Sequence, residues 1–226
     1  MRRSFFTLGL CIPLTICALI GCGQPDTSTP AESRHEFVGT IVAVGDSLTA
    51  GFGVTEFEAY PAQLEQKLRA DGYRYKVVNA GVSGETSSGA LSRINWVLTL
   101  KPDMVILETG ANDGLRGIDP ELTMHNLHAI VAAFKAHGVT VVLAGMQMVH
   151  NLGAEYTSKF AENYPSVASA QQVILIPFFL AGVAGEPLLN QDDGIHPTAK
   201  GYGIITANIY PYIVEAIKEM PAASRQ

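Results

Sequence analysis

Five short apolar runs, each followed by a helix-like segment, constrain the fold of this 226-residue chain more than any other feature. The runs are rich in Val, Ile and Leu, and they lack the polar alternation of a strand with one solvated face. Such runs are typical of parallel strands that helices cover on both sides. The predicted strands are residues 40–44, 76–79, 104–108, 140–144 and 173–177.

Segments with helical periodicity separate the predicted strands. In residues 60–70, Leu64 and Leu68 lie four positions apart, and Asp71 and Gly72 supply a stop signal. The other predicted helices are residues 88–100, 121–136, 155–170 and 198–220, the last weakened by Gly201, Gly203 and Pro211. The alternation predicts one α/β domain, a flavodoxin-like three-layer α/β/α sandwich with a mostly parallel five-stranded sheet. Active sites of such sheets lie beyond the carboxyl ends of the strands.

The first 36 residues predict export. Two arginines precede an apolar stretch that ends near Ile20, and its length together with Pro13 disfavours the alternative of a retained membrane span. The sequence LIGC at 19–22 resembles the lipobox of bacterial lipoproteins, which implies cleavage before Cys22 and lipidation of that residue. We expect a signal peptide at 1–21, a flexible tether at 22–36 and one domain at 37–226. The protein would face the periplasm or the cell exterior, attached to a membrane by its lipid alone.

Composition excludes several classes of function. The cysteines are Cys11, Cys17 and Cys22, so the domain has no thiol nucleophile and no disulfide. The formal net charge is -6, and loss of Arg2 and Arg3 with the signal makes the mature chain two units more negative. Because the chain has no cluster of Lys or Arg, we expect no nucleic-acid partner.

The first predicted strand leads into GDSLTAGFG at 45–53, which contains Ser47. The glycines do not fit the dinucleotide fingerprint G-x-G-x-x-G, because position 56 is Glu. They do not fit the phosphate-binding loop either, and Thr49 stands where the G-x-S-x-G elbow needs its second glycine. Two interpretations stay open at this point: a tight turn, or a turn that presents a serine nucleophile.

A serine hydroxyl needs a base to accept its proton, and the base needs an orienting partner. Asp193 precedes His196 by three residues, with Gly194 between them, so its carboxylate can fold back onto the imidazole. An ordinary turn rich in Asp, Gly and Pro has the same composition. We interpret His125, His128 and His137 as surface or helix residues. The sequence does not indicate a role for His150. None of them has the partners of a metal site.

Four blocks together resemble the SGNH, or GDSL, hydrolase superfamily. They are GDSLTAGFG at 45–53, NAGVSG at 79–84, GAND at 110–113 and DGIHP at 193–197, in the family's order. The resemblance implies a catalytic triad of Ser47, His196 and Asp193. It also implies an oxyanion hole formed by Ser47, Gly81 and Asn112, while Asp113 and Arg116 are expected to fix the third loop. The sequences LETGANDGLRG and QDDGIHP look most like the periplasmic arylesterase group, which includes the multifunctional acyl-CoA thioesterase/lysophospholipase.

The resemblance implies hydrolysis of acyl esters or thioesters, such as aryl esters or lysophospholipids, through an acyl-serine intermediate without metal or cofactor. Export argues against cytosolic acyl-CoA as the natural substrate. Two alternatives stay open: a carbohydrate O-deacetylase that acts on a cell-wall polymer, and a non-catalytic binding lipoprotein. Residues 146–148 and 177–180 are candidates for an acyl groove, although core packing is the simpler interpretation of most of them. We expect a monomer whose partner is a small-molecule acyl ester.

Overall fold

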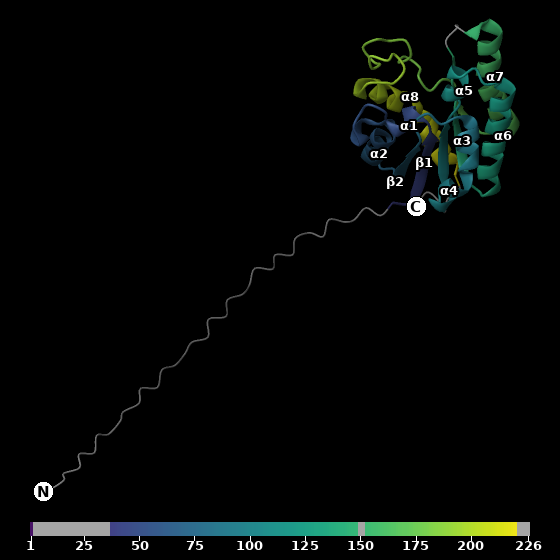
Figure 1. Cartoon of the computed structure of the whole chain (residues 1–226). Helices are drawn as coiled ribbons and strands as arrows, with labels where there is room; N and C mark the ends of the chain where they lie inside the picture. Colours follow the sequence, from purple (N-terminus) through teal and green to yellow (C-terminus); the bar gives the residue numbers. More distant parts are fainter. Residues whose placement is uncertain (2–36, 149–151, 221–226) are drawn as a thin grey trace. The chain divides into compact units, whose positions relative to one another are not determined.

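The computed structural model describes Met1 and residues 37–148 and 152–220 (Figure 1). The chain divides into two units, and the fold reported below is that of the described residues in the unit His35–Gln226. The expected signal peptide and tether, with Cys22, lie outside the described residues, as does His150. Within the described ranges, no helix combines the length and the apolar character needed to cross a membrane.

Five parallel strands form one sheet in the order β2-β1-β3-β4-β5, which confirms the predicted α/β fold with its parallel sheet. The strands are β1 (Gly39–Gly45), β2 (Tyr75–Gly81), β3 (Met104–Glu108), β4 (Thr140–Ala144) and β5 (Ile174–Ile176). The order reverses at β1, which pairs with β2 on one side and with β3 on the other. Chain segments that leave β1 and β3 therefore diverge at a topological switch point, the usual ligand site of an open α/β sheet.

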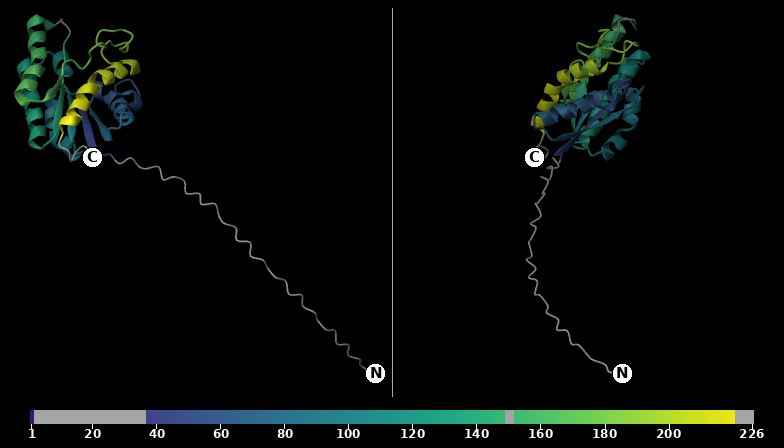
Figure 2. Two further views of the ribbon diagram at one scale, coloured as in Figure 1. Left: turned by 180° about the vertical axis from the view of Figure 1, so that it is seen from behind. Right: turned by 90° about the vertical axis from the view of Figure 1, so that its left-hand side faces the viewer.

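Helices cover both faces of the sheet, as predicted. α2 (Tyr60–Ala70) and α8 (Ala199–Glu219) lie together on one face. The other face carries α3 (Ser87–Ser92), α4 (Ile94–Thr99), α6 (Pro120–Ala136) and α7 (Ala154–Gln171), and Figures 1 and 2 show the two layers from three directions. Short helices follow two strand ends: α1 (Ser47–Ala50), the 3-10 turn η1 (Glu56–Glu58) and α5 (Ala111–Leu115). Residues 41–44 and 104–107 are completely buried, which explains why their runs show no alternation.

Two helices differ from their predictions. Residues 88–100 form α3 and α4 instead of one helix, because Arg93 leaves helical geometry at φ -108 and turns its guanidinium inward onto Glu85. α8 runs unbroken through Pro211, whose interior position costs about 3 kcal/mol. Five buried apolar side chains at helical spacing, each worth roughly 1.5–3 kcal/mol, outweigh that cost: Tyr202, Ile205, Ile209, Ile213 and Ile217.

Candidate active site

The turn after β1 is built to hold Ser47 at the end of the strand. Asp46 caps α1, because its Oδ1 accepts the Leu48 N–H at 2.9 Å, and Ser47 is the first helical residue. Gly51 ends the helix at φ +80, a conformation that favours glycine. A Cβ on Gly53, at φ +77, would overlap the side chain of Gln191. The two trailing glycines are therefore required by backbone geometry and packing.

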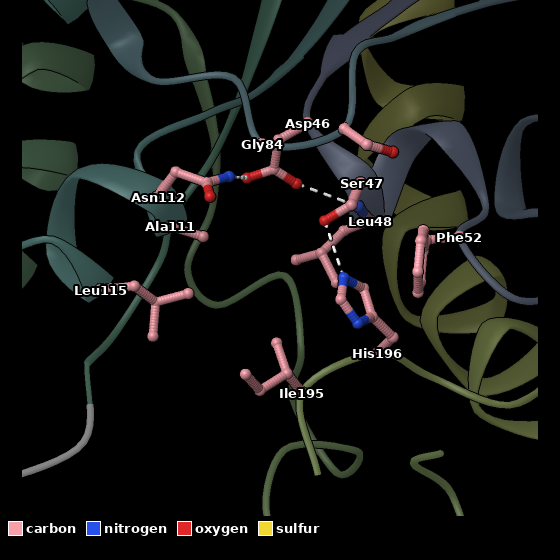
Figure 3. A pocket seen from close by; sticks show the side chains of 11 residues that line it. Asp46, Ser47, Leu48, Phe52, Gly84, Ala111, Asn112, Leu115, Ile195 and His196 are labelled. Carbon is pink, nitrogen blue, oxygen red and sulfur yellow. Dashed lines mark hydrogen bonds between the residues drawn. The ribbon is translucent and has the colours of Figure 1, made fainter. Parts of the chain in front are cut away.

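Ser47, His196 and Asp193 form a continuous hydrogen-bonded chain. His196 Nε2 lies 2.8 Å from Ser47 Oγ, and His196 Nδ1 lies 2.7 Å from Asp193 Oδ2; Figure 3 shows the serine and the imidazole meeting at the cavity. Because an ionised carboxylate only accepts hydrogen bonds, the proton is on Nδ1. Nε2 is then free to accept the hydroxyl proton of Ser47. The sequence thus pointed to three residues that the fold brings together.

The carboxylate of Asp193 is held by its own turn. Its Oδ1 accepts the N–H groups of Ile195 at 2.9 Å and of His196 at 3.0 Å. The backbone bond from His196, followed by the bond from its ring and by the Ile195 N–H, lowers the pKa of Asp193 to about 2. Asp193 therefore stays ionised wherever the enzyme is folded near neutral pH. The neighbouring Asp192 is exposed and makes no such bond within the described residues.

Asn112 approaches the same cavity from the end of β3. It lies in the first turn of α5, and its Nδ2 donates to Asp46 Oδ2 at 3.0 Å (Figure 3). Gly110, at φ +109, starts this helix, and a Cβ there would overlap the hydroxyl of Tyr164, which donates to Thr109 O at 2.9 Å. The tight start of α5 places the Asn112 amide beside the nucleophile turn.

The second block contributes Gly84 to the cavity, and the expectation for Gly81 is corrected. Gly81 is the last residue of β2, and its N–H donates to Asn79 Oδ1 at 2.9 Å, so this N–H is already used. Gly84 lines the cavity with Ser47 and Asn112. Its N–H has no partner among the described residues, and its carbonyl accepts Arg116 Nη2 at 2.7 Å.

A turn signal distinguishes the two glycines of this block. The Glu85 N–H bonds to Val82 O at 3.0 Å, and Gly84 occupies the third position of that turn at φ +78. A type II turn requires positive φ at this position, which favours Gly there. The sequence prediction chose the glycine closer to the strand and missed the turn that follows it.

Ser47 and His196 line a cavity of about 320 Å³. Phe52, Leu115 and Ile195 line it, and each is about half exposed, so they form an apolar rim. The rings of Phe52 and His196 lie with their centroids 4.6 Å apart. Figure 3 shows both side chains at the cavity. Leu48 and Ala111 extend the apolar lining inward. The site therefore joins a polar reaction centre to an apolar surface.

Comparisons with known proteins agree with this geometry. A model of the GDSL-like lipase/acylhydrolase family matches residues 43–204. The chain belongs to this family. It is 39% identical to "Esterase TesA" of Pseudomonas aeruginosa over 76% of this chain and 86% of that protein. It is 38% identical to "Thioesterase 1/protease 1/lysophospholipase L1" of Escherichia coli strain K12, over 70% of this chain and 75% of that one.

The solved structures give the same result for the fold. The psychrotrophic esterase EstA from a Pseudoalteromonas species superposes with a TM-score of 0.76 at 32% identity. The match covers 80% of this chain and all of that one, whose crystals contained the inhibitor monoethylphosphonate. The protein is accordingly an acyl hydrolase of the GDSL type.

Of the residues considered for an acyl groove, most pack in the core or line another cavity, in line with the simpler interpretation. Met146 and Phe179 are core residues with at most 2% exposure, and Phe179 packs edge-on against Tyr60. Pro177 and Phe178 line a separate cavity against α8. None of these four side chains lines the cavity at Ser47, because β5 and the segment after it turn toward α8.

The carboxyl groups of Asp46 and Glu108 are buried beneath the turn that contains Ser47. The sequence analysis did not single out Glu108. Glu108, the last residue of β3, accepts Thr49 Oγ1 at 2.8 Å and the Asp46 N–H at 3.4 Å through Oε2. Burial, reinforced by the charge of Asp46, raises the pKa of Glu108 well above its ordinary value. Burial likewise raises the pKa of Asp46 to about 6. An acidic residue that ends an apolar strand was the available signal for Glu108.

The loops around the site are tied down as expected from the third block. Asp113, fully buried, accepts the Ser87 N–H at 2.7 Å and the Ser87 hydroxyl at 2.5 Å, which links α5 to α3. His128 lies beside Gln171 and His137 beside the carbonyl of Ala133, both as helix residues. In residues 37–148 and 152–220, no three His, Cys, Asp or Glu side chains gather closely enough to hold a metal.

Proposed function

We propose that this GDSL hydrolase cleaves acyl esters and thioesters through an acyl-enzyme on Ser47. His196 Nε2 accepts the hydroxyl proton as Ser47 Oγ attacks the acyl carbon, and it returns that proton to the departing alcohol or thiol. Water then attacks the acyl-serine with the same proton transfers, which releases the acid and restores the hydroxyl. The observation that carries this proposal is the unbroken chain of 2.7 and 2.8 Å hydrogen bonds from Asp193 to Ser47.

The oxyanion is proposed to be stabilised by the Ser47 N–H, the Gly84 N–H and Asn112 Nδ2. The two backbone N–H groups are without partners among the described residues, and all three residues line one cavity. Donors fixed before the reaction stabilise charge that appears only in the transition state, and removing one costs about 10²–10³ in rate. Gly84 replaces Gly81 in this assignment for the reasons given above.

The substrate is proposed to carry an acyl chain on the apolar rim of Phe52, Leu115 and Ile195. The polar groups of the cavity, such as Asp46 and Asn112, belong to the reaction centre, which leaves few groups to recognise a sugar. This lining supports aryl esters, thioesters or lysophospholipids over a cell-wall carbohydrate. The printed names of the relatives, an esterase, an arylesterase and a thioesterase/lysophospholipase, point to the same substrate classes. The intact hydrogen-bonded chain argues against a purely binding role.

The test is a panel of p-nitrophenyl esters from acetyl to long-chain acyl. We expect hydrolysis by the purified protein, preference for chains longer than acetyl, and none by Ser47→Ala with an unchanged thermal midpoint. Ser92→Ala is the matched control and should keep full activity, because Ser92 is a surface residue whose hydroxyl bonds, in the described part of the chain, only to Gly89 O. Turnover by Ser47→Ala equal to wild type would overturn the mechanism. Strict acetyl preference would favour the O-deacetylase.

Export and anchoring are proposed from the sequence. Residues 1–21 would be removed as a signal, Cys22 would carry the lipid, residues 22–36 would be the tether and residues 37–226 the catalytic domain, a monomer on the outer side of a membrane. Metabolic labelling with a fatty acid should mark the protein and should fail for Cys22→Ser. Label retained by that variant would contradict lipidation at this residue.

A further inference from the structure

We propose that Asp46 is a positioning residue of the oxyanion hole: its carboxylate fixes the side-chain amide of Asn112 with the nitrogen toward the reaction centre. This inference rests on the proposed role of Asn112 as an oxyanion donor. The bond that carries it joins Asn112 Nδ2 to Asp46 Oδ2 at 3.0 Å, across the switch point between β1 and β3.

The carboxylate of Asp46 has little freedom to turn. The residue is completely buried, and its Oδ1 accepts the Leu48 N–H at the start of α1. The backbone N–H of Asp46 donates to Glu108 Oε2. Both the backbone and the carboxylate of Asp46 are therefore held by hydrogen bonds. A side chain fixed at both oxygens is a rigid reference point for whatever bonds to it.

A carboxylate selects one of the two orientations of an amide. The oxygen and nitrogen ends of Asn have almost the same shape, so packing alone hardly distinguishes them. An ionised carboxylate accepts only, and it therefore demands the nitrogen of Asn112. One N–H of that nitrogen goes to Asp46, and the second N–H is left for the substrate oxygen. Figure 3 shows the amide turned toward Asp46 at the edge of the cavity.

Electrostatics argues that orientation is the role of this carboxylate. A negative charge near a developing oxyanion raises the energy of the transition state, so Asp46 is a poor choice for stabilising charge directly. Burial raises the pKa values of the other titratable groups that face Asp46 besides His196, and so opposes further negative charge beside it: Glu108, Tyr60, Tyr164 and Tyr202. The cost of the Asp46 charge is compensated by the donor that it holds in place.

Asp46→Asn tests the proposal with almost no change in shape. The substituted side chain keeps an oxygen for the Leu48 N–H, but its amide nitrogen faces Asn112, which then turns its own oxygen toward that nitrogen. A substrate oxyanion meets the oxygen of Asn112 instead of the nitrogen. We expect kcat to fall about 10²-fold with little change in KM, as for loss of one oxyanion donor. Asp103→Asn, the same replacement at an aspartate that accepts the Thr40 N–H at the far end of β1, should leave kcat unchanged.

A double-mutant cycle separates positioning from other effects. Asn112→Ala should lower kcat by a similar factor, and adding Asp46→Asn to it should cause little further loss, because there is no amide left to orient. If Asp46→Asn lowers kcat by the same factor in both backgrounds, Asp46 does not act through Asn112 and the inference is overturned. If Asn112→Ala leaves kcat unchanged, the oxyanion role in the proposed function fails instead. Active sites are counted with a p-nitrophenyl alkylphosphonate, so kcat refers to folded enzyme.

A measurement on the unmutated protein covers the case in which Asp46→Asn does not fold. The side-chain amide of Asn112 is assigned in ¹H–¹⁵N spectra by its loss in Asn112→Ala. Two well-separated proton signals, with the downfield one moving as Asp46 titrates, are expected from an amide held by a carboxylate. A pair of signals that overlaps the free asparagine position and ignores pH contradicts the proposal.

Discussion

The two halves of the active site reach the same hydrogen bond by different means. Ser47 lies in a buried turn. Asp46 and Thr49 on either side of it are completely buried, and both bond to Glu108 at the end of β3. His196 lies on a surface loop, and the side chain of its partner Asp193 is 39% exposed. The proposed nucleophile is thus positioned by tertiary packing, whereas the proposed base is oriented by hydrogen bonds within a few residues.

Because of this difference, substitutions in the two halves should affect activity and stability differently. Changes to the buried groups around Ser47, as opposed to its hydroxyl, disturb the bonds that hold β1 and β3 together, so they affect folding and catalysis at once. Changes on the base side break local bonds that few other residues depend on, so they affect catalysis first.

Asp193→Asn should lower kcat about 10⁴-fold, because an amide no longer forces the proton onto Nδ1 of His196. The urea midpoint at pH 7 should fall only slightly, since solvent screens the bonds of this exposed carboxylate. Asp192→Asn, the same change one residue earlier, is the control and should behave like wild type in both measurements. A large loss of stability in Asp193→Asn would show that the base loop is more deeply integrated than its exposure indicates.

Gly45→Ala should lower the free energy of unfolding by about 3 kcal/mol or more and abolish activity with it. A Cβ there would overlap Thr49 Oγ1 and the carbonyl of Glu108, neither of which can move freely. The matched variant on the base side is Gly194→Ala. Its Cβ would meet nothing within 4 Å, so only the positive φ of +70 is penalised, at about 1 kcal/mol. Equal losses in urea denaturation would contradict the contrast.

Gln191→Ala should loosen only the loop that carries Asp193 and His196. The Gln191 amide donates to Phe52 O at 2.7 Å and to Pro197 O at 3.0 Å, and so joins the loop to the nucleophile turn. Because small misplacements of a catalytic group are costly, we expect kcat to fall about tenfold with a small change in stability. A kcat equal to wild type would mean that the local bonds of Asp193 suffice without this link.

The pH dependence of stability should have opposite signs in the two halves. Burial raises the pKa of Asp46 to about 6, so the folded protein holds this proton more tightly than the unfolded chain, and wild type loses stability as pH rises from about 4 to 6. Hydrogen bonds lower the pKa of Asp193 to about 2, so its contribution is present above about pH 4 and is lost as pH falls toward 2.

Urea titrations at pH 3, 4, 5, 6 and 7 check both signs, and this is the smallest effect of the set. Relative to wild type, Asp46→Asn should gain stability as pH rises from 4 to 6, because it has no buried charge to form. Asp193→Asn should lose less stability than wild type below pH 4. Parallel curves for wild type and Asp46→Asn would show that Asp46 titrates as an ordinary surface carboxyl.

The sequence alone determined the strands, the order of the blocks and the candidate side chains Ser47, Asn112, Asp193 and His196. The strands follow from apolar runs, whereas the four side chains follow from the resemblance of four sequence blocks to the GDSL hydrolases. The turn after the first strand and the spacing of Asp193 and His196 left ordinary turns open as an alternative. Local patterns also explain the error at Gly81, where the strand end was recognised and the following turn at Gly84 was not.

The remaining features of the site depend on the tertiary structure. The inward turn of Arg93, the bond between Asp46 and Asn112, and the position of Glu108 beneath Thr49 all join residues that are 8–66 positions apart. The apolar rim likewise combines Phe52, Leu115 and Ile195 from three separate segments of the chain. Such contacts depend on strand register and helix packing, which no short window of sequence contains. The order of the sheet therefore fixed how a recognisable serine and histidine became one site.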